Sequence, residues 1–93
     1  MALTERFEND KIEVVGPYKT VQVRRATVIE RDGVEISRSF HRNSLQCGTL
    51  DDNNNLVDRD ISGEDADVQA ICNAVWTQAV KDAYKDHLIA AAT

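Results

Sequence analysis

The chain has 93 residues, of which 42% are hydrophobic and 29% are charged, and its formal net charge is −5. This composition is typical of one globular domain and excludes a disordered or collagen-like chain. No stretch approaches the roughly 18 consecutive apolar residues of a membrane span, so no membrane partner is expected. Residues 1–42 hold eight Lys or Arg and seven Asp or Glu, whereas residues 43–93 hold three and nine. The acidic second half argues against nucleic acid as the partner, because phosphate binding needs a concentrated positive field.

Residues 11–42 predict an antiparallel β-meander of about three strands. The first strand covers residues 11–15 and ends at Gly16-Pro17, because proline lacks the N–H that a β-ladder needs. Residues 18–31 alternate with the period of a half-buried strand. One face carries Val21, Val23, Thr27 and Ile29, and the other carries Gln22, Arg24, Ala26 and Glu30. Val28 breaks this alternation.

Asp32-Gly33 is the dipeptide that a two-residue type I′ hairpin turn favours, because both positions need positive φ. A turn of this kind predicts three opposed pairs, Ile29 with Ile36, Thr27 with Arg38 and Arg25 with Phe40. The expected apolar face then consists of Val21, Val23, Ile29, Val34, Ile36 and Phe40. Arg25 and Arg38 share this face, where they either keep their charged ends in water at its periphery or reach an acidic partner.

Residues 43–61 predict a long loop, and residues 63–90 predict a single amphipathic helix with Ser62 as its N-cap. Its apolar stripe comprises Val68, Ile71, Cys72, Val75, Trp76, Ala79, Val80, Tyr84, Leu88 and Ala91. A helix of about 28 residues is roughly 40 Å long, whereas a ten-residue strand covers about 33 Å. Residues 1–93 are therefore expected to form one small α+β domain whose uncovered apolar surface meets another subunit.

Candidate chemistry is sparse, and the sequence predicts no catalytic, cofactor or metal site. Residues 58–63 resemble the start of a calcium loop, but the twelfth position is Gln69 instead of Glu, and a helix cap explains the same residues. Residues 51–55 are interpreted as an exposed turn. Cys47 and Cys72 lack metal-ligand spacing and are expected to be reduced thiols. A small enzyme or ligand-binding domain would need His41, Arg42 and a carboxylate to converge in a pocket.

Possible interface residues come from the sheet and the helix. The arginines at positions 24, 25, 31, 38 and 42 form the main basic concentration, and the interleaved Glu30 and Glu35 favour a solvated or inter-subunit salt-bridging face over nucleic acid. Trp76 is either a core anchor or an interface hot spot. The predicted interface set is Arg25, Arg38, Phe40, Trp76, Val80 and Tyr84.

Three segments carry a family resemblance, namely residues 60–77, Phe40-His41-Arg42 and the opening MALTERFEN. In these segments the chain resembles small uncharacterised proteins encoded by marine bacteriophages, including those of cyanobacteria. The resemblance covers nearly the whole chain and assigns no functional residues. It implies expression in the cytoplasm of an infected bacterial host and a role as a minor virion or assembly component.

The leading hypothesis is a non-enzymatic structural or assembly protein that contacts itself, as a homo-oligomer, or other phage or host proteins. The alternative is a small regulatory protein that binds a host macromolecule.

Overall fold

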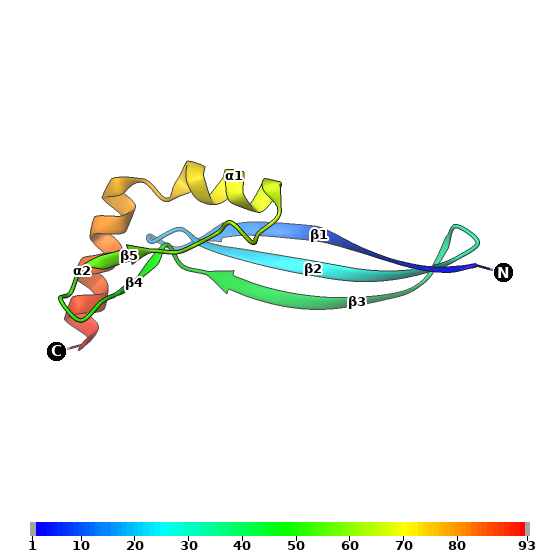
Figure 1. The fold of residues 1–93 in the computed structure, drawn as a ribbon, viewed down its shortest axis with the longest axis horizontal. Helices are drawn as coiled ribbons and strands as arrows, with labels where there is room; N and C mark the ends of the chain where they lie inside the picture. The colour runs from blue at the N-terminus through cyan, green and yellow to red at the C-terminus, as the bar shows by residue number, and fades with distance from the viewer. Residues whose placement is uncertain (1, 93) are drawn as a thin grey trace.

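The computed structural model describes residues 2–92, which form a long three-stranded antiparallel sheet, a small hairpin and two helices (Figure 1). The main sheet has the order β1-β2-β3 and consists of β1 (Leu3–Val15), β2 (Thr20–Arg31) and β3 (Val34–Leu45). The remaining elements are β4 (Gly48–Leu50), β5 (Leu56–Asp58), α1 (Ala66–Val75) and α2 (Gln78–Ala92). The predicted α+β class, a β-meander followed by a helical C-terminal part, is confirmed.

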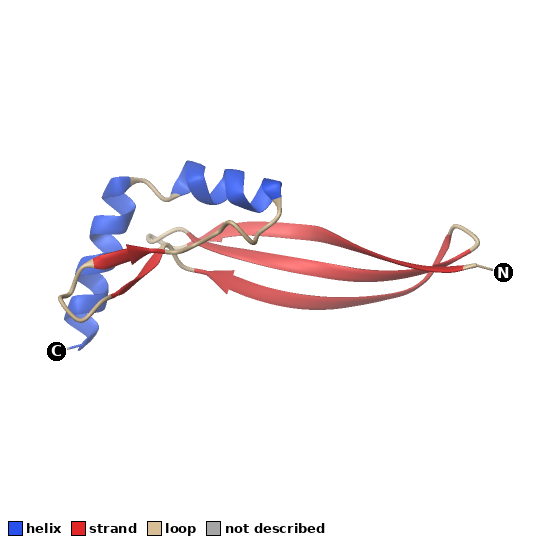
Figure 2. Cartoon of the chain, viewed as in Figure 1, coloured by secondary structure: helices blue, strands red, loops and turns tan. Residues whose placement is uncertain are grey.

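The molecule is elongated because one end of the sheet projects beyond everything else (Figure 2). It measures 58 × 24 × 21 Å, and its radius of gyration is 17.3 Å, against about 12 Å for a compact chain of this length. We call the projecting strand segments, residues 3–9, 25–31 and 34–41, the arm. The helices, the β4–β5 hairpin and the helix-covered end of the sheet form the head.

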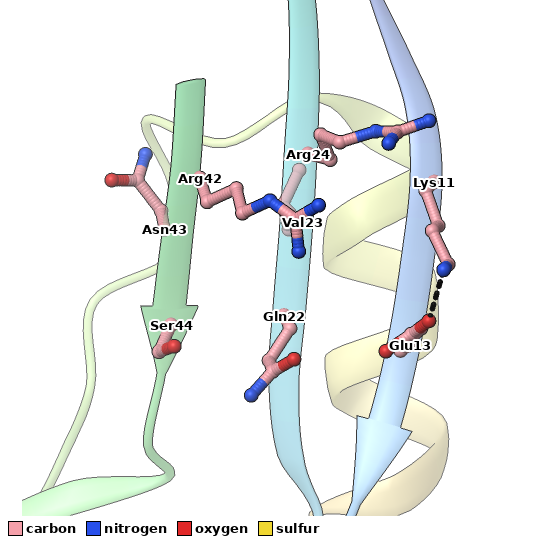
Figure 3. A pocket seen from close by; sticks show the side chains of 8 residues that line it. All are labelled: Lys11, Glu13, Gln22, Val23, Arg24, Arg42, Asn43 and Ser44. Atoms are coloured by element: carbon pink, nitrogen blue, oxygen red, sulfur yellow. Dashed lines mark ion pairs between the residues drawn. The ribbon is translucent and has the colours of Figure 1, made fainter. Parts of the chain in front are cut away.

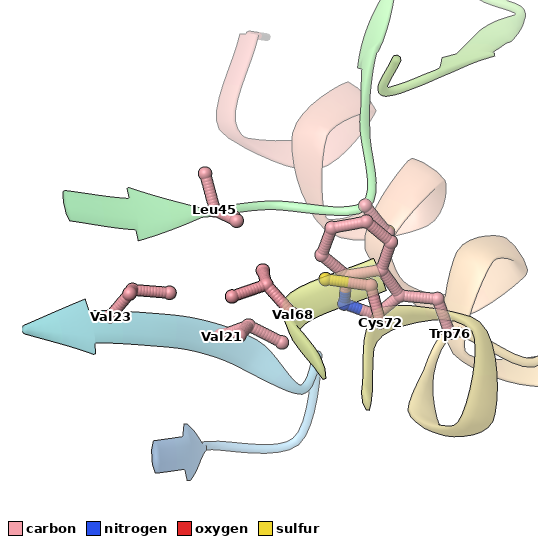
Figure 4. Close-up of a cluster of buried hydrophobic side chains, with 7 residues drawn as sticks. Val21, Val23, Leu45, Val68, Cys72 and Trp76 are labelled. Atoms are coloured by element: carbon pink, nitrogen blue, oxygen red, sulfur yellow. The ribbon is translucent and has the colours of Figure 1, made fainter. Parts of the chain in front are cut away.

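The hydrophobic core lies in the head, between the sheet and α1 (Figure 4). It consists of Val21, Val23, Leu45, Cys47, Val68, Cys72 and Trp76. The indole Nε1 of Trp76 donates a hydrogen bond of 2.8 Å to the carbonyl of Lys19, in the turn between β1 and β2. The valine and leucine side chains in this core contribute about 1.5–3 kcal/mol each on full burial, so the head holds most of the apolar stabilisation.

The predicted single helix over residues 63–90 is wrong, because the chain leaves the helix at Trp76. Trp76 has φ −87° and ψ 69°, which turns its ring into the core, and Thr77 restarts the helix by accepting the N–H of Val80 at 3.3 Å. No glycine or proline marks this break. α2 packs beside β4 instead of extending α1. The sheet, and not a helix, is therefore the element that extends beyond the elements packed against it.

Ser62 is not the N-cap that the sequence predicts. Its N–H donates to Asp60 Oδ1 at 2.9 Å, within a turn, and α1 begins four residues later. Asp65 occupies the N-cap position without a side-chain cap, because its carboxylate instead accepts a hydrogen bond of 2.7 Å from the Asn9 side chain of β1. The Asp65 side chain thus contacts a distant strand instead of the N–H groups at the start of its own helix.

Two other element predictions need correction. β1 begins at Leu3, not at Lys11, and its early residues were missed because charges occupy much of both faces. The predicted loop over residues 43–61 contains the β4–β5 hairpin, although its tip is the predicted turn. There, Asp51 Oδ1 accepts the N–H groups of Asn53 and Asn55, each at 2.9 Å. The apolar residues that flank this tip are few, so the sequence signal for strands is weak.

The hairpin turn itself is confirmed, since Asp32 has φ 51° and Gly33 has φ 83°. The predicted pairings beyond it are wrong, because the register shifts by one residue at Ile36, a β-bulge. Ile29 lies opposite Ser37, and Arg25 lies opposite His41.

The shift has a clear physical reason in the head. It places Leu45 opposite Val21, inside the core, where the unshifted register would place Ser44. The same shift moves Arg38 and Phe40 to the opposite face of the sheet from the one predicted, since side chains alternate along a strand.

Candidate interaction surfaces

The arm has two faces of different chemistry, which the strand register defines. The helix-side face is the one that carries α1 in the head, and on the arm it presents Leu3, Glu5, Phe7, Asn9, Arg25, Thr27, Ile29, Arg31, Val34, Ser37, Ser39 and His41. The back face presents Thr4, Arg6, Glu8, Ala26, Val28, Glu30, Glu35, Arg38 and Phe40.

The charged residues of the back face form ion pairs with one another. Glu8 links two arginines, with 2.6 Å to Arg38 Nη1 and 3.3 Å to Arg6 Nη1. Arg38 also forms a two-bond fork with Glu35, at 2.7 and 3.1 Å, while Arg6 donates to Glu30. Every charged side chain in this network thus has an oppositely charged neighbour.

These charged side chains also cover apolar atoms. Ala26 and Val28 in β2 are completely buried, although they lie outside the head's core. Val28 is paired with Arg6 and Arg38 across the sheet, and Ala26 with Glu8 and Phe40. Long side chains can bury their stems while their charged ends stay in water. Ala26 and Val28 are therefore shielded without a partner, whereas Phe40 on the same face keeps 50% of its surface exposed.

The ion pairs change the acidity of the carboxyl groups involved. The hydrogen bond from Arg38 lowers the pKa of Glu8 below its ordinary value, and Arg6 adds to this effect. Arg38 likewise lowers the pKa of Glu35, while both carboxylates raise the pKa of Arg38. Water reaches all these groups, so each pair makes only a small contribution to stability.

The helix-side face of the arm is open and carries large apolar side chains among its polar residues. Leu3, Phe7 and Val34 keep 61%, 55% and 64% of their surface exposed. Arg25 lies 5.3 Å from the centre of the Phe7 ring, and Ile29 is partly buried between the neighbouring strands. Large exposed apolar side chains grouped on one face are characteristic of an interaction site. In contrast to the back face, no described segment covers them.

Charges mark the two ends of this open face. At the head end lies the start of α1, with Glu64, Asp65 and Asp67, where Asp65 is 3.8 Å from Arg25. At the tip, Arg31 makes no ion pair within 4 Å with residues 2–92. The neighbouring Asp32 accepts a hydrogen bond from the Ala2 N–H at 3.0 Å. The face thus runs from an acidic helix start to a tip with an unpaired arginine.

A hollow of about 220 Å³ lies on the back of the sheet near the head (Figure 3). Lys11, Arg24 and Arg42 form a row across three strands beside it. Glu13 forms an ion pair of 2.7 Å with Lys11, and the Asp10 carboxylate accepts two hydrogen bonds from Arg24, of 3.0 and 2.7 Å. Arg42 makes no ion pair within 4 Å with the described residues. Its guanidinium extends over β2 into the hollow, where it can attract a small anion.

The predicted interface residues are not brought together. Arg25 lies on the helix-side face, and Arg38 and Phe40 lie on the back face. Trp76 is buried in the head, where Val80 and Tyr84 pack against the same core. This placement fits the core-anchor interpretation of Trp76. The residues that sequence reasoning missed are Leu3 and Phe7, because the strand that carries them was not recognised.

His41 and Arg42 are neighbours on β3 and so point to opposite faces of the sheet. The convergence that an enzyme built on both residues requires is absent from the described part of the chain. His87 stacks on Tyr18, with 4.8 Å between the ring centres, beside Tyr84 on α2.

Cys47 and Cys72 are free thiols in the core, and burial raises the pKa of both. Residues 2–92 contain no group of three or more His, Cys, Asp or Glu side chains that could hold a metal ion. Within the same range, neither helix is long and apolar enough to span a membrane.

Comparisons with known proteins give no match. No protein-family model, no curated protein and no solved structure is similar to this chain.

Proposed function

We propose that this chain is a non-enzymatic structural or assembly protein that acts through protein–protein contacts made by the helix-side face of its arm. One observation carries the proposal. The arm projects from the head with Leu3, Phe7 and Val34 exposed on a single face, whereas on the other face ion-paired side chains lie around the buried Ala26 and Val28 and Phe40 is exposed. Only 55–64% of each side chain is still exposed, so covering it gains about 1–2 kcal/mol each, and a protein that covers this face stabilises the arm.

The proposal also includes the phage-type context that the sequence resemblance implies. Minor virion and assembly components act by binding neighbouring subunits, and a projecting strand arm suits that task because its side chains reach beyond the head. A regulatory protein that binds a host macromolecule would use the same face, so the identity of the captured partner separates the two.

Site-specific photo-crosslinking in bacterial cells tests the proposal. Phe7→p-benzoylphenylalanine places the photoreactive group on the helix-side face, and Phe40→p-benzoylphenylalanine is the matched control. The two rings are similarly exposed, at 55% and 50%, but lie on opposite faces. We expect a discrete protein adduct from position 7 and little from position 40. Equal labelling from both positions, or no adduct from position 7, would refute the proposed surface.

A further inference from the structure

We infer that the open face of the arm binds the same face of a second copy of this chain, with the two arms antiparallel. This inference rests on the proposed function and names the partner and the orientation. Three observations support it. α1 already fills the layer above the sheet at the head end of the face, the two ends of the face carry opposite charges, and the face has a limited area.

The position of α1 decides the orientation. A helix packed on a sheet fills a layer about 10 Å thick, and two sheets packed face to face are also about 10 Å apart. α1 of each copy already occupies that layer at the head end of the sheet. Two arms that pointed the same way would bring the sheet of one head into the space that the other copy's α1 fills. Antiparallel arms avoid this collision, because each arm then lies in the layer beside the partner's α1.

The charges at the ends of the face favour the same arrangement. Antiparallel packing brings the tip of each arm to the start of the other copy's α1. Arg31, which has no ion pair with residues 2–92, then approaches the acidic group of Glu64, Asp65 and Asp67. This contact occurs twice, because a two-fold axis makes the interface self-complementary.

The small residues of β3 leave room for such packing. Ser37 and Ser39 lie beside Ile29 and Thr27 at the middle of the face, so the two sheets can approach along β2 and β3. The bulky Leu3 and Phe7 stand along β1, where antiparallel packing about an axis across the strands sets them against the β1 of the partner.

The area of the face limits the affinity of the dimer. Seven residues at about 3.3 Å along three strands about 4.8 Å apart cover roughly 330 Å² of flat sheet. Standing side chains enlarge the accessible area, but it remains below the about 800 Å² per partner of a standard interface. The dimer therefore belongs to the weak class, with a dissociation constant expected in the micromolar range or above.

Chemical cross-linking of engineered cysteines tests face and orientation together. Ser39→Cys places a thiol near the expected two-fold axis on the helix-side face, and Thr4→Cys places one on the back face of the same arm. Cys47 and Cys72 are buried, so the unmodified chain measures the background. With a short bismaleimide at about 100 μM protein, we expect at least about tenfold more covalent dimer from Ser39→Cys. Equal yields from the two variants would overturn the inference.

Light scattering on the intact chain gives the second readout. The average mass should rise from 10.4 kDa toward twice that value as concentration increases. Phe7→Ser should weaken dimerisation about tenfold or more, because one exposed aromatic ring is lost from each copy, and Phe40→Ser should leave it unchanged.

A monomer at every concentration up to about 1 mM, or an equal effect of the two serine variants, would refute the second copy as the partner. The proposed function would then survive only if position 7 forms photo-adducts with another protein. The two failures are therefore distinguishable.

Discussion

The head and the arm are built from the same three strands, yet they are held together by different means. In the head, α1 covers β2, and Val21, Cys72 and Trp76 form a core that excludes water. In the arm, Ala26 and Val28 are equally buried, but their cross-strand neighbours are ion-paired side chains and Phe40. The difference shows that a sheet can extend beyond its hydrophobic core when ion-paired side chains shield one face. The other face of the arm remains open to a partner.

The largest expected effect is in the head, at Trp76. Trp76→Ala should destabilise the chain by about 3–5 kcal/mol, because it leaves a cavity and removes the hydrogen bond to Lys19. Urea unfolding followed by circular dichroism measures this change. Trp76→Phe is the control, since it keeps most of the ring volume and should cost clearly less. If both variants were as stable as the parent, Trp76 would not be the core anchor.

A matched pair of valines compares the two kinds of cover directly. Val21→Ala in the head should cost about 2–3 kcal/mol, because the surrounding core cannot close the cavity. Val28→Ala in the arm should cost about 1 kcal/mol, because flexible arginine stems can settle into the space. Both free energies of unfolding come from the same denaturation experiment. A larger loss for Val28 than for Val21 would mean that the arm has a rigid core of its own.

Acid should weaken the arm before the head. The pKa values of Glu8 and Glu35 are lowered in the folded chain from the ordinary 4.5, chiefly by hydrogen bonds from Arg38. A lowered pKa stabilises the fold above the unfolded value, and this stabilisation is lost as pH falls below 4.5 through the folded values. NMR spectra recorded from pH 6 downward should show arm amides shifting toward unfolded positions before those of α1.

The variant Arg38→Gln is the control for this acid effect. It removes the guanidinium that lowers both pKa values, so the arm should be weaker at neutral pH and less sensitive to acid. Simultaneous loss of arm and head in the parent chain would contradict a separate ionic contribution in the arm.

The smallest expected effect concerns the break between the helices. Thr77→Ala removes the acceptor for the Val80 N–H, a long bond of 3.3 Å, and should cost about 0.5–1 kcal/mol. Thr77→Ser keeps the hydroxyl and should restore most of the loss in thermal unfolding. If Thr77→Ala instead stabilised the chain, a continuous helix through Trp76 would be the better state.

Features that depend on neighbouring residues are predicted well from the sequence, whereas features that depend on distant residues are predicted poorly. The β2 alternation and the Asp32-Gly33 turn depend on neighbouring residues, and both are confirmed. The bulge at Ile36 depends on whether Leu45 or Ser44 enters a core about ten residues away, which no local pattern encodes.

The remaining errors have similar causes. The helix breaks at Trp76, whose indole binds a turn 57 residues earlier, and no neighbouring glycine or proline marks this position in the sequence. The candidate surface was missed because Glu5 lies between Leu3 and Phe7 on the same face and interrupts their apolar alternation. A partner remains a proposal, and the surface proposed for it now lies on the projecting sheet instead of on an overlong helix.

Because Ile36 is an extra residue in β3, the number of residues between the Gly33 turn and Leu45 decides which side chains lie on each face of the arm. Deleting one residue between the Gly33 turn and Leu45, or inserting one, would exchange the two faces for part of β3 or displace Leu45 from the core. A substitution in the same stretch alters only one position. Natural variation of this protein is therefore expected to preserve the length of β3 more strictly than its composition, and engineered insertions there are best made in pairs.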